Sequence, residues 1–158
     1  MEMEFDVKID AGLLYDYMLR HTYTSFAGVL GTAVGALMIV GFAMGGHPLY
    51  LLAGLIILVY QPGSLFLKSR QQALNPAFKE PLHYKLTEEG VEVSQGEKKE
   101  FQQWGSMVKA VSTGRSIILY TSRFNASIFP RAQLQDSLSG VVEMISTHMP
   151  AGKVNIRI

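Results

Sequence analysis

The side chains best suited to acid–base, nucleophilic or metal chemistry in this chain are its histidines, serines and carboxylates. The four histidines are His21, His47, His83 and His148. None has zinc-ligand spacing with another histidine or with a carboxylate. Serine, histidine and aspartate occur together only as residue types, without the nucleophile elbow that presents a catalytic serine. We therefore expect no catalytic residue, no metal and no cofactor, and a protein that is not an enzyme.

Other short motifs point to no chemistry. Gly28, Gly31 and Gly35 do not follow a predicted strand, so they are not a phosphate-binding loop. Asn125-Ala-Ser127 matches a glycosylation acceptor, which is inert on a cytoplasmic turn. The chain has no cysteine, and its net charge of +1 argues against a nucleic-acid partner.

One uncharged stretch organises the rest of the chain. From Thr22 to Leu67 there is no Asp, Glu, Lys or Arg. Each half of this stretch is about 20 residues, or about 30 Å as a helix, which matches the hydrocarbon core of a bilayer. We predict a transmembrane hairpin at 22–67, with helices at about 24–45 and 48–67. The alternative is a soluble protein that buries this hairpin, but so small a domain has too little other apolar surface to cover it.

Lysine and arginine flank the hairpin at one end. Arg20 precedes it, Lys68 and Arg70 follow it, and the turn at 45–48 has neither residue type. Positive residues stay on the cytoplasmic side, so both termini are expected in the cytoplasm. Lipid headgroups are expected to contact the nearby cations at about 1 kcal/mol each. The candidate contacts are Lys68, Arg70, Lys79 and Arg131.

Small residues recur along the first apolar helix. Such rows let a second backbone come close. The row consists of Ala27, Gly31, Gly35, Gly41 and Gly45, and Gly54 faces it from the second helix. These residues predict packing within the hairpin, and homo-oligomers formed through the same groove are the alternative. Pro62 is expected to kink or end the second helix.

Alternating apolar residues predict strands on both sides of the hairpin. Residues 1–21 read as a short strand and a juxtamembrane helix, and 68–81 as a linker or a short helical extension. Residues 82–158 form a cytoplasmic domain. Its strands are expected near 82–86, 91–93, 101–104, 108–112, 116–120 and 126–129, followed by a helix with an apolar stripe that includes Leu138 and Ile145. The tail residues Val154, Ile156 and Ile158 suggest an edge strand.

The expected fold is therefore a membrane protein of the α+β class. It combines a two-helix transmembrane hairpin with a small antiparallel sheet, curved into a half-barrel and capped by the C-terminal helix. Trp104, the only tryptophan, has two interpretations. A buried core ring is favoured, and an exposed anchor that touches lipid or a partner is the other.

Three segments carry a family resemblance. They are Tyr84-Lys-Leu-Thr-Glu-Glu-Gly-Val91, Phe101-Gln-Gln-Trp104 and Ser127-Ile-Phe-Pro-Arg131. Their order, behind two membrane helices and a short N-terminal strand and helix, resembles the YcxB-like membrane proteins of bacteria. The resemblance implies a cytoplasmic domain similar to a pleckstrin-homology (PH) fold. It implies no specific activity, because most members of that family are uncharacterised.

Two functional hypotheses follow. The first is a non-enzymatic inner-membrane protein whose PH-like domain binds a protein partner or lipid headgroups at the cytoplasmic face. The second is an immunity or self-protection protein, whose hairpin occludes a membrane-acting toxin or bacteriocin in the bilayer. The expected partners are membrane lipids, a membrane protein or toxin, and a second copy of the chain bound through the glycine-rich helix.

Overall fold

A computed structural model describes residues 2–157 of the chain. The chain divides into two compact units. Unit 1 combines the residues up to Leu13 with those from Ala73 onward, and unit 2 runs from Leu14 to Gln72. The N-terminal strand therefore belongs to the C-terminal domain, which differs from the predicted separate segment 1–21. Ile158, the end of the predicted tail strand, lies outside the described residues.

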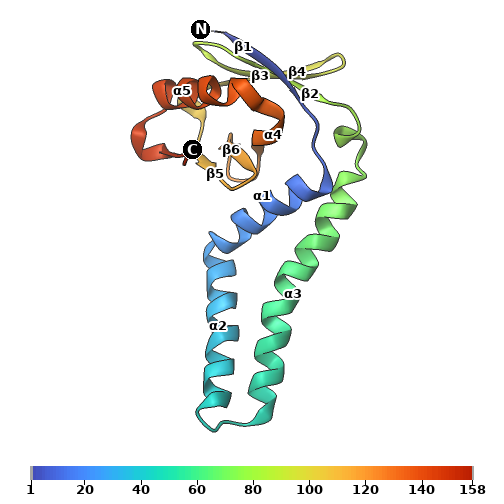
Figure 1. Ribbon diagram of the computed structural model, residues 1–158, viewed down its shortest axis with the longest axis vertical. Coiled ribbons are helices and arrows are strands. Elements are labelled where there is room, and N and C mark those ends of the chain that lie inside the picture. The colour runs from blue at the N-terminus through green and yellow to red at the C-terminus, as the bar shows by residue number, and fades with distance from the viewer. Residues whose placement is uncertain (1, 158) are drawn as a thin grey trace. The chain divides into compact units, whose positions relative to one another are not determined.

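Unit 2 is a helical hairpin. Helix α1 (Ala11–Tyr23) leads into α2 (Phe26–Ala43), which a tight turn joins to α3 (Pro48–Ala73). Ser25 starts α2, because its hydroxyl accepts a hydrogen bond from the backbone N–H of Gly28 at 3.1 Å. The turn needs a glycine at position 45, where φ is +92°. Figure 1 shows α2 and α3 side by side along their length.

Pro62 does not end the second helix, which corrects one of the two outcomes predicted for it. Helix α3 passes through this proline and continues to Ala73, beyond the predicted end at residue 67. A proline removes one backbone N–H donor and leaves the other helical bonds in place, so a long helix bonded on both sides can continue through it. Residues 68–73, predicted as part of a linker or a short helical extension, are therefore helical. The short helix η1 (Pro76–Phe78) follows, capped by the Asn75 side chain.

Unit 1 contains two four-stranded sheets within the described residues. Sheet A has the order β1 (Met3–Val7), β2 (Leu82–Leu86), β3 (Gly90–Gln95), β4 (Lys98–Gln103), all antiparallel. Sheet B has the order β7 (Ala126–Pro130), β6 (Ser116–Tyr120), β5 (Lys109–Ser112), β8 (Val154–Asn155). In sheet B only the edge strand β8 is parallel to its neighbour, β5. The α+β class is confirmed.

The strands do not form the single curved sheet that the sequence predicted. The chain leaves sheet A at the short helix η2 (Trp104–Ser106), so Trp104 lies just after β4 and not within the third strand of the meander. The backbone N–H of Trp104 still reaches the Glu89 carbonyl, at 3.3 Å. Sheet B begins at Lys109, three residues after η2 ends. One residue earlier, the N–H of Val108 donates a hydrogen bond to the Tyr120 carbonyl at 2.9 Å. This turn redirects the chain, and two packed sheets replace one half-barrel.

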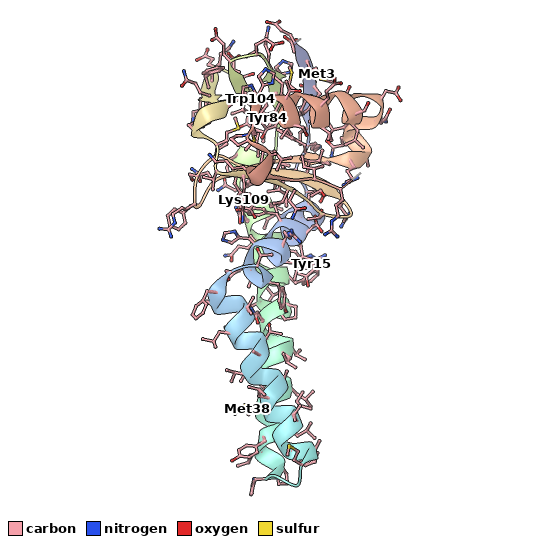
Figure 2. The ribbon with its side chains drawn as sticks, turned by 90° about the vertical axis from the view of Figure 1, so that its left-hand side faces the viewer. Met3, Tyr15, Met38, Tyr84, Trp104 and Lys109 are labelled. Atoms are coloured by element: carbon pink, nitrogen blue, oxygen red, sulfur yellow. The ribbon has the colours of Figure 1, made fainter. Side chains whose placement is uncertain are left out.

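An aromatic cluster joins the two sheets. Phe5 on β1 lies opposite Tyr84 on β2, and their rings stack at 5.9 Å. Phe129 from sheet B sets its edge against both rings, at 5.4 Å from Phe5 and 4.9 Å from Tyr84. All the large side chains at this point are apolar or aromatic, so the core of unit 1 lies between the sheets. Figure 2 labels Tyr84 among the side chains of this unit.

Helices complete unit 1. After β7 come α4 (Arg131–Leu134), η3 (Gln135–Ser137), α5 (Leu138–His148) and η4 (Ala151–Lys153). The predicted apolar stripe of α5 is present, with Val141, Met144 and Ile145 buried. Gly140 on this helix approaches β1 so closely that an added Cβ would lie 2.7 Å from the Met3 side chain. Helix α5 therefore packs beside the N-terminal strand.

Candidate functional site

Two glycines bring the backbones of α2 and α3 into contact. A Cβ added at Gly54 would lie 2.7 Å from the carbonyl oxygen of Gly35 and 2.8 Å from Cγ1 of Ile39. A Cβ added at Gly35 would lie 2.9 Å from the Leu58 side chain. Both glycines are buried. Close approach at small residues is how helices gain packing energy in lipid.

The other small residues of the predicted row are placed differently. A Cβ at Gly31 or Gly41 would make an ordinary 3.7 Å contact with an α3 side chain. Ala27 is exposed, and Gly45 lies in the turn beyond the end of α2. The contact within the hairpin is therefore closest at Gly35 and Gly54.

The outward surface of the hairpin is apolar. Only 11% of the apolar window of α2 and 6% of that of α3 are buried. Both helices are long and apolar enough to cross a membrane. The exposed large side chains include Phe26, Val29, Leu30, Leu37, Val40, Leu49, Leu52, Leu55, Ile56 and Val59.

The cations predicted to contact headgroups lie in both units. Lys68 and Arg70 are exposed near the end of α3, in unit 2. The Arg70 guanidinium lies 5.1 Å from the centre of the Phe66 ring, a cation–π arrangement that orients this charge. Lys79 is exposed just after η1, in unit 1.

Arg131 is hydrogen-bonded to other residues of unit 1. Its Nη2 donates a hydrogen bond to the carbonyl of Arg157, and its backbone N–H bonds to the carbonyl of Arg115 at 2.9 Å. Its Nε is buried without a hydrogen-bond partner among the described residues. Arg131 therefore links the start of α4 to the β5–β6 turn and to the C-terminal tail, and its guanidinium is less available to a headgroup than the other three predicted cations.

Trp104 is buried in unit 1. Its side chain is 4% exposed, and its indole N–H donates to the Thr87 carbonyl at 2.9 Å. The ring stacks on the imidazole of His148, with centroids 5.5 Å apart and planes 19° apart. Figure 2 labels Trp104 within the packed side chains of the unit. The core interpretation fits this burial, whereas a candidate partner surface at Trp104 does not.

His148 is bracketed by two hydrogen-bond acceptors. Its Nδ1 lies 2.9 Å from the Met144 carbonyl oxygen and its Nε2 lies 2.8 Å from Oε2 of Glu88. Only the doubly protonated imidazolium donates to both. The Met144 carbonyl and then the Glu88 carboxylate raise the pKa of His148 above its ordinary value, against a smaller opposing effect of burial. The ring thus ties the end of α5 to the β2–β3 turn through a charge-assisted bond.

Trp104, His148 and Glu88 form a structural link between α5 and the β2–β3 turn. Within residues 2–157, no three histidine or carboxylate side chains come together as a metal site. His148 and Glu88 are 60 residues apart in the chain, so no local spacing signals their pairing. Sequence reasoning therefore missed the contact of His148 with Trp104 and Glu88.

A second feature that sequence reasoning missed is visible in the sequence itself. Between Glu100 and Asp136 the chain has no carboxylate side chain, and the same holds after Glu143. These two segments supply every strand of sheet B. The signal is an acid-free run, which an overall net charge of +1 conceals.

Comparison with known proteins identifies the central part of unit 1. Residues 86–145 match the family of YcxB-like proteins. The match confirms the resemblance that the sequence motifs indicated, over fewer than half of the chain's residues. The YcxB-like segment runs from the end of β2 into α5, so it contains Glu88 and Trp104, and His148 lies just beyond it. No curated protein and no solved structure matches the chain.

Proposed function

We propose that this chain is a non-enzymatic protein of the bacterial inner membrane, anchored by α2 and α3 as a transmembrane hairpin. Unit 1 is then a cytoplasmic PH-like domain that binds a protein partner or lipid headgroups. The observation that carries the proposal is the outward-facing apolar surface of the hairpin.

This surface fits lipid better than water. Soluble monomers rarely expose a contiguous apolar patch larger than a few hundred Å². A hairpin inside a soluble protein would be mostly buried, which the small buried share of both helices argues against. Helix α2 has 18 residues, about 27 Å of rise, and α3 has 26 residues, about 39 Å, so each is close to or above the thickness of a hydrocarbon core. Helices also satisfy their own backbone hydrogen bonds, as a bilayer requires.

The orientation rests on the distribution of cations. Arg20, Lys68 and Arg70 stand at the open end of the hairpin, and the turn between α2 and α3 has no lysine or arginine. The positive-inside rule then favours a cytoplasmic location for both termini. The PH-like fold is supported by two largely antiparallel sheets that pack around an aromatic core beside a C-terminal helix.

Cysteine accessibility tests this proposal, because the chain has no cysteine of its own. One variant carries His47→Cys in the hairpin turn, and a second carries Glu97→Cys in the β3–β4 turn. We expect an impermeant maleimide to label position 47 in spheroplasts and position 97 only after lysis. Recovery of the chain in an alkaline carbonate supernatant, or labelling of position 97 in intact spheroplasts, would contradict the proposal.

The partner is tested in native membranes with a photoreactive residue at Leu37, which is exposed on α2. The immunity alternative places the working surface on the hairpin, so it predicts a toxin adduct at this position. Binding through unit 1 predicts adducts on the exposed surface of that domain and none with a toxin at Leu37.

A further inference from the structure

The two sheets of unit 1 carry opposite charge. Two cations of sheet A form ion pairs, since Lys85 lies 3.1 Å from both Glu2 and Glu4, and Lys99 lies 3.3 Å from Glu92. The strands and turns of sheet B contain cations and no carboxylate side chain. None of the ion pairs formed by the described residues involves a sheet B cation. The cations in sheet B, in its turns or directly beside its strands are Lys109, Arg115, Arg123, Arg131, Lys153 and Arg157.

Three of these cations gather at one end of the sheet. Lys109 begins β5, pairs with Tyr120 and places its ammonium 4.8 Å from the centre of that ring. Lys153 directly precedes β8, which runs beside β5, and its Nζ donates to the Met107 carbonyl at 3.0 Å. Arg123 lies in the turn that follows Tyr120. Figure 2 labels Lys109 on this sheet.

Phe124 lies next to Arg123 in the same turn and is exposed. At 86% exposure it is the most exposed large hydrophobic side chain of the described residues. Val108, directly before β5, is also exposed, next to Lys109. We call this end of sheet B, made of Val108, Lys109, Arg123, Phe124 and Lys153, the Phe124 tip.

The exposure of Phe124 belongs to an ordered turn. The Ser122 hydroxyl accepts hydrogen bonds from the N–H groups of Phe124 and Asn125, at 3.2 and 3.0 Å. The Asn125 carbonyl accepts from the N–H groups of Thr121 and Ser122, at 3.1 and 3.2 Å. The turn therefore holds the exposed aromatic ring outward on a hydrogen-bonded backbone.

We propose that the Phe124 tip docks on the anionic lipid surface of the membrane that holds the hairpin. Cations beside an exposed aromatic ring match the layers of a bilayer interface, where phosphate groups attract Lys and Arg and the acyl boundary accepts apolar rings. The absence of any carboxylate side chain from sheet B leaves nothing in the sheet to neutralise that attraction. The inference rests on the proposed function, since the hairpin is what keeps unit 1 near lipid.

The test uses the full-length chain in nanodiscs, with a polarity-sensitive NBD label on Asn125→Cys so that Phe124 is retained. One set of discs contains phosphatidylcholine alone, and the other contains phosphatidylcholine with phosphatidylglycerol. A label on Glu97→Cys, in a turn of sheet A, is the matched control. A label on Leu37→Cys reports the hairpin, and the emission of the buried Trp104 reports folding of unit 1.

We expect the label at position 125 to shift to shorter wavelength in the anionic discs only, with no shift at position 97. Salt at 1 M reduces the Debye length to about 3 Å and should reverse the shift. Each of Lys109→Gln, Arg123→Gln and Lys153→Gln should lower the docking equilibrium constant about fivefold. Phe124→Ser should abolish the shift while Trp104 emission stays unchanged.

Several results would overturn the docking proposal. An unshifted label at position 125 in anionic discs, with the Leu37 label in an apolar environment, refutes docking and leaves the membrane hairpin standing. A shift of equal size in neutral discs refutes its dependence on charge. A shift that requires more than one copy per disc, or an added protein, assigns the tip to a protein partner instead. If the Leu37 label itself reports water, the proposed function fails and the docking proposal fails with it.

Discussion

Adding one methyl group at Gly54 tests whether α2 and α3 pack through their glycines. A Cβ at this position would lie 2.7 Å from the Gly35 carbonyl oxygen, whereas ordinary contacts begin near 3.4 Å. The obstacle is backbone, so it cannot rotate away, and the helices must separate by about 0.7 Å. A gap of that size forfeits about a quarter to a half of the contact energy of the atoms that face it.

A matched control lies on the same helix. Gly63 has nothing within 4 Å of an added Cβ. Glycine to alanine favours a helix by about 1 kcal/mol at either position, so this gain cancels when the two variants are compared. Overpacking typically costs about 1–3 kcal/mol. We therefore expect Gly54→Ala to be about 1–3 kcal/mol less stable than Gly63→Ala.

The assay measures the separation of the two helices directly. Spin labels on Leu37→Cys and Ile56→Cys are unique because the chain has no cysteine, and both positions are exposed. We expect Gly54→Ala to broaden and lengthen their distance distribution, and to lower the SDS concentration at which the hairpin opens. Equal distances and equal midpoints for the two alanine variants would refute glycine-mediated packing within the hairpin. If Gly54→Ala instead lost self-association while the distance between the labels at positions 37 and 56 stayed unchanged, the glycines would serve contacts between copies of the chain.

Three further predictions concern unit 1, and Trp104 emission is the folding probe for the variants that keep this residue. Because the folded pKa of His148 is raised, its contribution to stability is complete below the unfolded value of about 6.5 and is lost as pH rises through the folded pKa. The free energy of unfolding should therefore fall with rising pH in the wild type more than in His148→Gln, and parallel profiles would refute the role of the Glu88 ion pair. Trp104→Phe leaves the Thr87 carbonyl without its indole donor and should cost about 1–3 kcal/mol in denaturant titration followed by circular dichroism, whereas an unchanged midpoint would contradict that bond's importance. Gly90→Ala should abolish folding or cost more than about 3 kcal/mol, since the new Cβ would lie 2.2 Å from a β4 carbonyl oxygen, and a folded variant of normal stability would show that the strands can part there.

Much of the local structure could be predicted from the sequence. Period-two alternation placed β2, because side chains of successive strand residues point to opposite faces. Apolar runs between turn residues placed β5, β6 and β7 within a residue or two. The Asp10 side chain, just before α1, accepts a hydrogen bond from the Leu13 N–H at 2.8 Å, as the preference of helix starts for aspartate leads one to expect. The end of α3 was not predictable from Pro62, because the surrounding helical bonds outweigh the one that a proline removes.

The candidate site was less predictable. The glycine spacing indicated a helix contact, but only the structure selects Gly35 and Gly54 as its closest point. The cations expected at headgroups included Arg131, whose side chain is occupied by a carbonyl of the C-terminal tail. The Phe124 tip was overlooked because its members lie up to 45 residues apart in the chain and come together only through strand pairing.

The sequence by itself determined that the chain has an apolar hairpin with its turn near residues 45–48, the approximate position of most strands and the acid-free composition of residues 101–135. These are local properties, set by the order of residue types along a few turns or strands. Only the tertiary structure decided that β1 pairs with β2, although the whole hairpin separates them in the sequence. It also decided that Trp104 stacks on His148 and that the strands divide into an acidic and a basic sheet. Such contacts join residues far apart in the chain, and their free energy depends on packing that no local window of sequence contains.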